Sequence, residues 1–352
     1  MKKIILSIFF ILISILLISE NAKIDSLENV LKSVSEKKQA AIINELSQAY
    51  RHINIEKSYE YGIQAFELAK KYKDNLEKYK ALNSFGHYFR HKREYEKSIE
   101  YYEQALDVCR KLNDKALIAN ELDNLGHVYW FLGDFDIALS YYQNALEINL
   151  VVGEKTALAH SYNNIGSIYS RLGNYEKALE NFLHSLKIKE ELDDRRALAR
   201  TLNNLGNIFL KLDRYEKAVE YYERSLNYKK ELKDLDSIAY TLNNIGNVYL
   251  SLEDYEQAFS FYNQALARYE ETENKKGIST TLNNIAIIYE YYKDFDNAVD
   301  YYKRSMNLKK ELGDKYGFAN TSKNIASLYL DKDDRHQALD YCKQSLMSII
   351  FI

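Results

Sequence analysis

A four-residue pattern that ends in a small side chain recurs every forty residues along this chain of 352 residues. Asn203-Asn204-Leu205-Gly206 returns as Asn243-Asn244-Ile245-Gly246, and no insertion or deletion disturbs the spacing. In this register the last position of the pattern, which we call the small-residue position, falls at residues 46, 86, 126, 166, 206, 246, 286 and 326. A fixed period of this size is typical of a solenoid, in which one supersecondary unit is stacked many times. The repeat therefore predicts a repeat architecture and disfavours most enzyme folds.

Each repeat is expected to be a pair of helices joined by a short polar turn. In the repeat from Ala197 to Asp236, apolar side chains on both sides of Asp213-Arg214 fall three and four residues apart, which is the spacing of an amphipathic helix. We call the two helices helix A and helix B. Their apolar or small positions are Ala199, Leu202, Leu205, Gly206, Ile208, Phe209 and Leu212 in helix A, and Tyr215, Ala218, Val219, Tyr222, Leu226 and Leu232 in helix B.

The small-residue position lies in the middle of helix A, where glycine costs about 1 kcal/mol relative to alanine. Glycine nevertheless recurs there, as at Gly206 and Gly246, and Ala286 takes the same position in a later repeat. The requirement is therefore for a small side chain and not for an unusual backbone angle. Alanines such as Ala218, twelve residues later, supply a matching small surface on helix B. We expect the two helices to approach each other closely at this point.

The composition excludes several classes of function. The chain has no proline, and Lys+Arg of 48 against Asp+Glu of 51 leaves a net charge of −3 with both signs interleaved. A nucleic-acid surface would need a basic face, so no nucleic-acid partner is expected. No glycine-rich phosphate loop, Cys-x-x-Cys pair or nucleophile elbow is present, so we expect no enzyme activity and no cofactor. The high content of Lys, Ile, Asn and Tyr fits an AT-rich bacterial genome.

The two cysteines, Cys109 and Cys342, lie almost six repeats apart, a separation too large for a disulfide within one solenoid. Cys342 stands where other repeats have an aromatic side chain of helix B, so it is expected to be buried. Two charged runs, Lys189-Glu190-Glu191 and Lys309-Lys310-Glu311, are interpreted as solvated faces of mixed charge.

The N-terminal segment has the features of a secretory signal. Lys2-Lys3 precede an apolar run from Ile4 to Ile18 that is short for a spanning helix. We therefore interpret residues 1–22 as a signal peptide, with an uncleaved N-terminal anchor as the alternative. The repeats would then be exported to the periplasm or cell envelope, or held at the inner membrane by that segment alone.

The order of side chains within one repeat resembles the tetratricopeptide repeat. Leu205-Gly206 is followed by an aromatic residue, a small residue, an aromatic residue and a small residue at the spacing of that family, at Phe209, Ala218, Tyr222 and Ser225. The resemblance extends from about residue 38 to residue 346. Two positions depart from the family pattern, because its tryptophan position holds Leu202 and its proline position holds Lys230. The period of forty residues is similar to that of a bacterial subclass.

The resemblance implies an all-α fold, a right-handed superhelical solenoid of antiparallel helix pairs. By extending the period backwards, we interpret residues 23–77 as a degenerate capping repeat and residues 78–352 as tandem repeats of forty residues. The last repeat is interpreted as truncated, because the polar stretch expected after Leu346 is replaced by Met347-Ser348-Ile349-Ile350-Phe351-Ile352.

In the family that the chain resembles, helix A lines a concave groove. Asparagine suits a peptide groove because its amide both donates to and accepts from an extended backbone. The alternatives are that the asparagines bond one repeat to the next, or that they reflect codon bias. We expect partner contact for the first Asn of each pair and a structural role for the second. Carried over to this chain, the predicted groove residues are Asn163, Ser167, Arg171, Asn203, Asn207, Lys211, Asn243 and Asn247.

His87 and His91 lie four residues apart on one helix A, and His127 takes the position of His87 in the next repeat. Two imidazoles at this spacing can bind a metal, but Asp123 is the only nearby candidate carboxylate. We therefore predict no metal site and interpret these side chains as part of a polar groove wall. A change in partner affinity near pH 6.5 is the lesser functional alternative.

Two functions from different classes remain. The first is a non-enzymatic scaffold protein that binds a peptide or a partner's helix in the groove. The alternative is the sensory region of a truncated bacterial signalling receptor, a histidine kinase or transcriptional regulator whose output domain is missing. The sequence leaves the partner's identity and the oligomeric state open.

Overall fold

The computed structural model describes residues 22–350, with side chains described to residue 348. These residues are almost entirely helical, and no strand occurs among them. The chain divides into two compact units, of which unit 1 ends at Asn174 and unit 2 begins at Tyr175. The predicted signal lies outside the described residues except for residue 22. No helix in the described part of the chain is long and apolar enough to span a bilayer.

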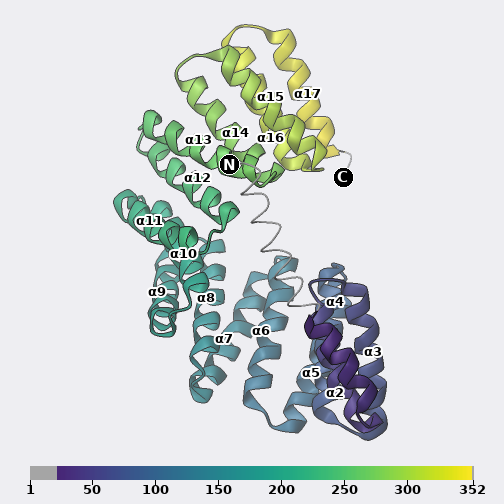
Figure 1. Cartoon of the computed structure of the whole chain (residues 1–352). Helices are drawn as coiled ribbons and strands as arrows, with labels where there is room; N and C mark the ends of the chain where they lie inside the picture. Colours follow the sequence, from purple (N-terminus) through teal and green to yellow (C-terminus); the bar gives the residue numbers. More distant parts are fainter. Residues whose placement is uncertain (1–21, 351–352) are drawn as a thin grey trace. The chain divides into compact units, whose positions relative to one another are not determined.

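In unit 1, residues 22–33 form a helix and are followed by seven further helices, each packed against the next (Figure 1). They are α2 (Glu36–Tyr50), α3 (Ile55–Tyr72), α4 (Asn75–His91), α5 (Tyr95–Leu112), α6 (Lys115–Leu132), α7 (Phe135–Val152) and α8 (Lys155–Arg171).

Unit 2 continues the same order, and the first helices of neighbouring repeats also touch, as α10 and α12 do. Its helices are α9 (Tyr175–Leu192), α10 (Arg195–Lys211), α11 (Tyr215–Glu231), α12 (Leu235–Ser251), α13 (Tyr255–Glu271), α14 (Lys275–Tyr291), α15 (Phe295–Glu311), α16 (Lys315–Asp331) and α17 (Arg335–Ile350). The prediction of an all-α solenoid of helix pairs is confirmed.

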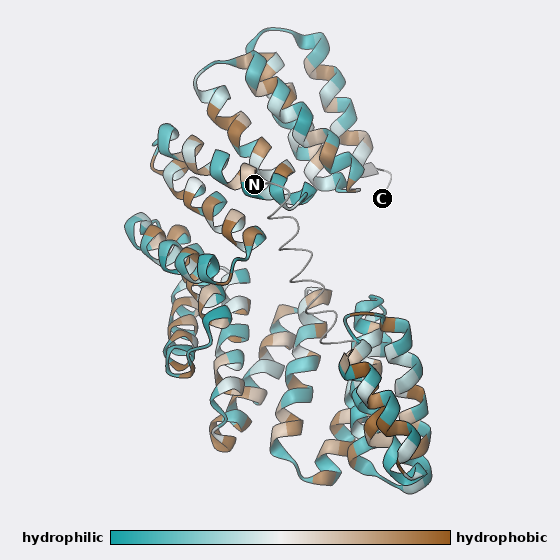
Figure 2. Ribbon diagram, viewed as in Figure 1, coloured by the Kyte–Doolittle hydropathy of each residue, from teal (hydrophilic) through white to brown (hydrophobic). Residues whose placement is uncertain are grey.

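The predicted helical hairpin is confirmed in the repeat from Ala197 to Asp236. The turn at Asp213-Arg214 separates α10 from α11, and the pair that they form packs along its whole length. Apolar and polar residues alternate along the ribbon of each helix (Figure 2), as expected of an amphipathic helix. The aromatic residue of helix B lies at the centre of this packing in both units, because Tyr102, Tyr142, Tyr222, Tyr262 and Tyr302 are among the largest fully buried side chains.

The expected close approach at the small-residue position is also confirmed. A Cβ atom added to Gly206 would lie 2.5 Å from Cε1 of Tyr222, and one added to Gly126 would lie 2.7 Å from Cε1 of Tyr142. Both distances are far below a van der Waals contact, so the tyrosine ring lies directly on the glycine. Ala286 occupies the same position against Tyr302 in one core cluster, which shows that the ring can shift enough to accept one methyl group.

From Lys73 to Asp333, turns recur every twenty residues, and each contains a residue in the left-handed backbone region. Lys233, for example, has φ of 54° and ends the pair formed by α10 and α11. The next residue, Asp234, then caps α12 by accepting a hydrogen bond from the backbone N of Ser237 at 3.1 Å. A chain without proline thus interrupts its helices with left-handed residues and acidic caps. The left-handed residues are Lys73, Arg93, Asn113, Gly133, Gly153, Gly173, Asp193, Asp213, Lys233, Glu253, Glu273, Lys293, Gly313 and Asp333.

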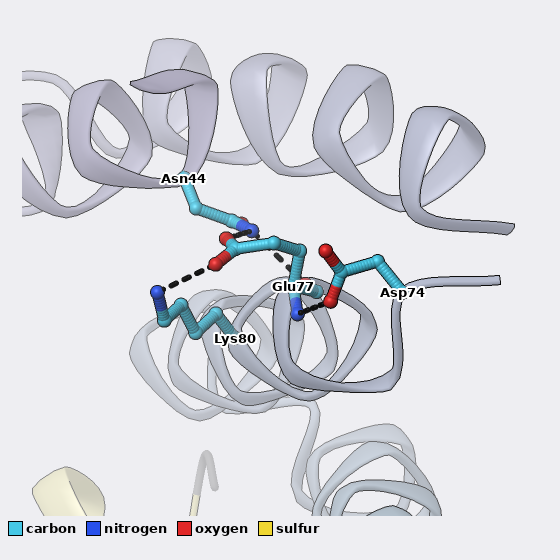
Figure 3. Close-up of polar contacts among 4 residues, drawn as sticks. All are labelled: Asn44, Asp74, Glu77 and Lys80. Carbon is cyan, nitrogen blue, oxygen red and sulfur yellow. Dashed lines mark hydrogen bonds and ion pairs between the residues drawn. The ribbon is translucent and has the colours of Figure 1, made fainter. Parts of the chain in front are cut away.

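A buried polar contact joins α2 to α4, the first helix of the next pair. Asn44 of α2 donates through Nδ2 to Oε2 of Glu77 at 2.8 Å and to the backbone carbonyl of Glu77 at 2.9 Å (Figure 3). Lys80 holds the other carboxylate oxygen of Glu77 at 2.7 Å. Asp74 caps the same helix through the backbone N of Glu77 at 3.1 Å. The first repeat is therefore integrated into unit 1.

The prediction for one cysteine is wrong. Cys109 is buried, but Cys342 is exposed. Cys342 takes the position of Tyr302, which packs in one cluster with Ile325 and Leu328 of the following helix α16. No helix follows α17 among the described residues, so this face of α17 has no such cover. Burial at this position depends on the next repeat and not on the residue type.

Candidate functional site

Two predicted groove residues of unit 2, Asn207 and Asn247, have the same hydrogen-bonded arrangement one repeat apart. The hydroxyl of Tyr222 donates to Oδ1 of Asn207 at 2.6 Å, and Nδ2 of Asn244 donates to the same oxygen at 3.4 Å. At Asn247 the corresponding donors are Tyr262 at 2.7 Å and Asn284 at 3.2 Å. Both donors require the carbonyl oxygen to face the protein, so the orientation of each amide is fixed.

The amide nitrogens of these two residues remain available. Neither Nδ2 of Asn207 nor Nδ2 of Asn247 donates a hydrogen bond to the protein within residues 22–350. Both side chains are half-buried, so the nitrogen still reaches solvent. The arrangement can therefore donate two pairs of N–H groups, held in the same orientation, to acceptors outside the chain.

Asn203 and Asn243, the first residues of their pairs, lie deeper. They are only 4% and 7% exposed. Oδ1 of Asn203 accepts from Lys229 of α11 at 3.3 Å and from Thr241 of α12 at 3.2 Å. Oδ1 of Asn243 accepts in the same way from Thr281 of α14 at 3.3 Å. These amides connect consecutive repeats and offer a partner little surface, and their predicted partner contact remains a prediction.

The second residue of the Asn243-Asn244 pair is also buried, and Asn244 bonds to Asn207 of the preceding repeat. Lys211, one helical turn after Asn207 on α10, is exposed. Asn207 and Lys211 are four residues apart and therefore share one face of α10, while the more deeply buried Asn244 of α12 supports the amide of Asn207.

In unit 1 the predicted groove residues lie along α8. Ser167 Oγ donates to the backbone carbonyl of Asn163 at 2.8 Å. Arg171 is exposed, and its guanidinium lies 5.7 Å from the ring centre of Trp130 on α6. A guanidinium above an indole ring is held in place by a cation–π interaction. Arg171 is thus a positioned positive charge at the end of α8.

The interpretation of the two charged runs as solvated faces is wrong for their first residues. Lys189 is 3% and Lys309 is 9% exposed, and each donates to a threonine of the next helix, Thr201 and Thr321, at 2.7 Å. Lys229 donates to Thr241 at 2.6 Å. Burial lowers the pKa of Lys189 and Lys229 to about 8. The position faces the next repeat, which the charge pattern of one helix does not reveal.

The histidines of unit 1 are set into the packing of their own repeats. Nδ1 of His87 lies 3.0 Å from a guanidinium nitrogen of Arg90, and Nδ1 of His127 lies 2.9 Å from the hydroxyl of Tyr142. Burial lowers the pKa of His127 to about 4 and that of His87 well below its usual value. Both rings are therefore neutral at pH 7. The described residues contain no group of three His, Cys, Asp or Glu side chains arranged to hold a metal ion.

The candidate carboxylate for that site, Asp123, is half-buried, and burial raises its pKa to about 7. Its Oδ1 atom has no hydrogen-bond partner among the described residues. Asp123 therefore contributes a half-buried acid with a raised pKa to unit 1.

The repeat pattern did not predict that arginines gather beside the histidines. Arg51, Arg90 and Arg93 line one open pocket together with His87 and other side chains of the first three repeats. Arg90 occupies a position at which most other repeats have an apolar or small residue, and this departure was the available signal. Arg51 lies in the degenerate first repeat, where the repeat pattern gives no guidance.

The family is shown by comparison with known sequences. Models of the tetratricopeptide repeat match four stretches of the chain, residues 77–150, 114–191, 157–231 and 237–311. No curated protein sequence matches the chain.

Solved structures with a similar fold include three of different kinds. BtubC (BKLC) from P. vanneervenii is 25% identical with a TM-score of 0.54, covering 62% of this chain and 92% of that one. Aspartyl phosphate phosphatase F from Bacillus subtilis is 16% identical with a TM-score of 0.65, covering 94% of each chain. The Rap conjugation gene regulator of the plasmid pLS20, in complex with the Phr* peptide, is 14% identical with a TM-score of 0.57, again covering 94% of each. The last two likenesses show the fold alone.

Proposed function

Because the chain belongs to the tetratricopeptide repeat family, we propose that it is a non-enzymatic scaffold protein that binds a peptide along the first helices of its repeats. The observation that carries the proposal is the pair of outward-facing amide nitrogens on Asn207 and Asn247. Each is fixed by a tyrosine hydroxyl of its own repeat, so it needs no reordering when a partner arrives. Preorganised donors bind more tightly because less conformational entropy is lost on binding.

The spacing of these donors suits an extended peptide. Packed helices lie about 10 Å apart, and α10 and α12 are neighbours. An extended chain advances about 3.3 Å per residue, so carbonyl groups three residues apart would meet the two amides. Such contacts go to the peptide backbone, which fits a scaffold that accepts a range of sequences.

Charged and polar groups near the amides would add selectivity. Lys211 lies one turn beyond Asn207, a spacing that keeps both side chains on one face of α10. We expect the peptide to carry a carboxylate on that side. In unit 1, Asn163, Ser167 and Arg171 occupy the corresponding positions of α8 and are proposed to contact a partner as well. Asn203 and Asn243 are proposed to act mainly by holding neighbouring repeats in register.

A peptide selected from a displayed random library against the full chain tests the proposal. Changing both Asn207→Asp and Asn247→Asp keeps the oxygens that bind Tyr222 and Tyr262 but removes the outward donors. Each lost hydrogen bond costs about 1 kcal/mol, so the dissociation constant should rise about 30-fold by calorimetry. The matched control, Asn227→Asp, changes an exposed residue of α11 and should leave the affinity unchanged. An unchanged affinity in the double variant, with helicity intact, would overturn the proposal.

Two of the similar structures bear on the alternatives. One is a phosphatase and another a gene regulator bound to a peptide. For this chain we propose no turnover, and an assay of acetyl phosphate hydrolysis should give the rate of buffer alone. The peptide-bound regulator supports a second candidate function, the sensory region of a signalling receptor. An output domain encoded downstream of codon 352 would support it, and an intergenic region there would contradict it.

A further inference from the structure

Unit 1 has an open pocket of about 450 Å³ between its first three repeats. Three arginines line it, Arg51 after α2, Arg90 at the end of α4 and Arg93 in the following turn. His52 and His91 lie beside them. No aspartate or glutamate is among the described residues that line the pocket. The chain as a whole is slightly acidic, so this concentration of positive charge is a local feature.

The nearby carboxylates form ion pairs or hydrogen bonds with residues that do not line the pocket. Glu56 forms an ion pair with Lys92, and Glu94 forms one with Lys97 at 2.6 Å. Glu121 lies in the interior, where it accepts hydrogen bonds from Asn83 and Tyr79. Within residues 22–350 none of these acids forms an ion pair with an arginine of the pocket. The arginines of the pocket therefore have no carboxylate ion-pair partner in the described part of the chain.

Arg51 is the arginine of the pocket whose side chain is most affected by burial. Its Nε atom is buried and has no hydrogen-bond partner among the described residues. Burial lowers the pKa of this guanidinium, and the neighbouring charge of Arg90 lowers it further. A buried charged donor without an acceptor is costly, and such groups usually have an acceptor that is a ligand, ion or water. An anion in the pocket would relieve the repulsion between Arg51 and Arg90.

We propose that this pocket binds the phosphoryl group of a small phosphate monoester. A phosphate monoester carries about −1.5 to −2 charges at pH 7 and three acceptor oxygens, which match several guanidinium groups better than a carboxylate with one charge does. Guanidinium groups bind phosphate oxygens through paired, charge-assisted hydrogen bonds. The volume lies in the range of pockets for small molecules, roughly 300–1,000 Å³.

Two aromatic side chains form one side of the pocket and could contact an organic group. Tyr95 of α5 and Phe131 of α6 line it and stack with ring centres 6.2 Å apart and planes inclined by 7°. Phe131 is 52% exposed although it is a large apolar residue. An aromatic group attached to the phosphate would cover this ring. The ligand class is therefore an aromatic or heterocyclic phosphate ester, and this site is separate from the residues proposed to bind a peptide.

Calorimetry with the full chain tests the ligand class. Phenyl phosphate should bind most tightly, inorganic phosphate more weakly, and benzoate at least about tenfold more weakly than phenyl phosphate, since it offers one charge and fewer acceptors. Equal affinities for benzoate and phenyl phosphate would overturn the assignment to phosphate. Tighter binding of inorganic phosphate than of phenyl phosphate would overturn the assignment to an ester, and binding of none of the three would overturn both.

Variants test the site itself. Arg90→Gln and Arg51→Gln should each weaken phenyl phosphate binding about tenfold or more. The matched control is Arg110→Gln, an exposed arginine of the same unit that pairs with Asp107 at 3.2 Å, and it should bind as the unchanged chain does. If Arg51→Gln lowers helicity, the affinity of Arg93→Gln for phenyl phosphate tests the site instead. Arg93 is exposed, so its substitution should leave the fold intact. Arginine variants that bind like the control would contradict the proposal. The Asn207→Asp and Asn247→Asp double variant should bind phenyl phosphate normally, which separates this site from the proposed peptide face.

Discussion

The two units have the same helix pairs but differ in the polar side chains buried between consecutive repeats. In each repeat a residue of helix B faces a residue twelve positions later, on helix A of the next repeat, and we call these two residues the interior pair. In unit 2 three interior pairs are a lysine and a threonine, Lys189–Thr201, Lys229–Thr241 and Lys309–Thr321. In unit 1 the equivalent pairs include Cys109–Glu121 and Asn149–Ser161, the latter bonded at 3.0 Å.

The difference separates what the fold requires from what it tolerates. The small-residue position and the buried tyrosine are the same in both units, so the fold requires their shape. The interior pair contains a buried base in unit 2 and a buried acid in unit 1. Burial lowers the pKa of Lys229 to about 8 and raises that of Glu121 to about 7. The same backbone thus accepts either sign of charge, and each unit has its own dependence on pH.

The largest effect is expected where the two units are alike. Gly126→Leu in unit 1 and Gly206→Leu in unit 2 should each lower the free energy of unfolding by about 3 kcal/mol, since the side chain would enter the ring of Tyr142 or Tyr222. Hydrogen exchange resolved by segment measures each unit separately. The Gly→Ala variants should cost less, as Ala286 shows. A large loss in only one unit would contradict the shared packing requirement.

The stability of unit 1 should fall as pH rises from 4.5 to 7. Burial raises the pKa of Glu121 from 4.5 to about 7, so the folded state keeps a proton that the unfolded state has lost. This contribution is complete below pH 4.5 and is lost by pH 7, a change of about 3 kcal/mol. Hydrogen exchange of α4 to α6 across this range measures it. Glu121→Gln should remove this part of the slope and leave the part due to Asp123. An identical slope in Glu121→Gln would contradict the assignment.

Unit 2 should respond in the opposite direction. The pKa of Lys229 is lowered from 10.5 to about 8, so above pH 8 the unfolded state binds a proton that the folded state has lost. Stability should therefore rise by about 2 kcal/mol between pH 8 and about 9.5. Lys229→Met should reduce this gain in the exchange of α11 and α12. The variant Lys230→Met, at the exposed neighbouring position, is the control and should retain the full gain.

The smallest effect is expected from exchanging equivalent polar residues. His127 in unit 1 and Asn207 in unit 2 both bond the buried tyrosine of helix B. Because His127 is neutral at pH 7, His127→Asn should change the free energy of unfolding by no more than about 0.5 kcal/mol. His127→Leu leaves the hydroxyl of Tyr142 without its partner and should cost about 1 kcal/mol by urea unfolding. Equal losses in both variants would show that the ring itself is required.

Much of the fold follows from spacing within one repeat. Helix bounds and the glycine contact depend on residues that are close in sequence, so the pattern around Gly206 predicted them. The burial of Lys189 and the exposure of Cys342 depend on whether another repeat covers the position, and one repeat does not contain that information.

The site was less predictable for a related reason. The position of Asn207 on the first helix followed from the repeat, but the orientation of its amide is set by Tyr222 and by Asn244 of the next repeat. The basic pocket combines Arg51, Arg90 and Phe131 from three consecutive repeats, including the degenerate one. A repeat pattern describes what the repeats share, and this pocket consists of residues in which they differ.

The left-handed turns have a consequence for how such a chain can lengthen or shorten during evolution. Because a turn of the same backbone form recurs every twenty residues, a segment of forty residues can be duplicated or lost with its ends joining at equivalent turns. A junction inside a hairpin, as at Asp213, transfers Lys229 and Thr241 together. A junction between hairpins, as at Lys233, separates them and can place a lysine opposite a foreign residue. Recombination should therefore be tolerated more often at the turns within hairpins.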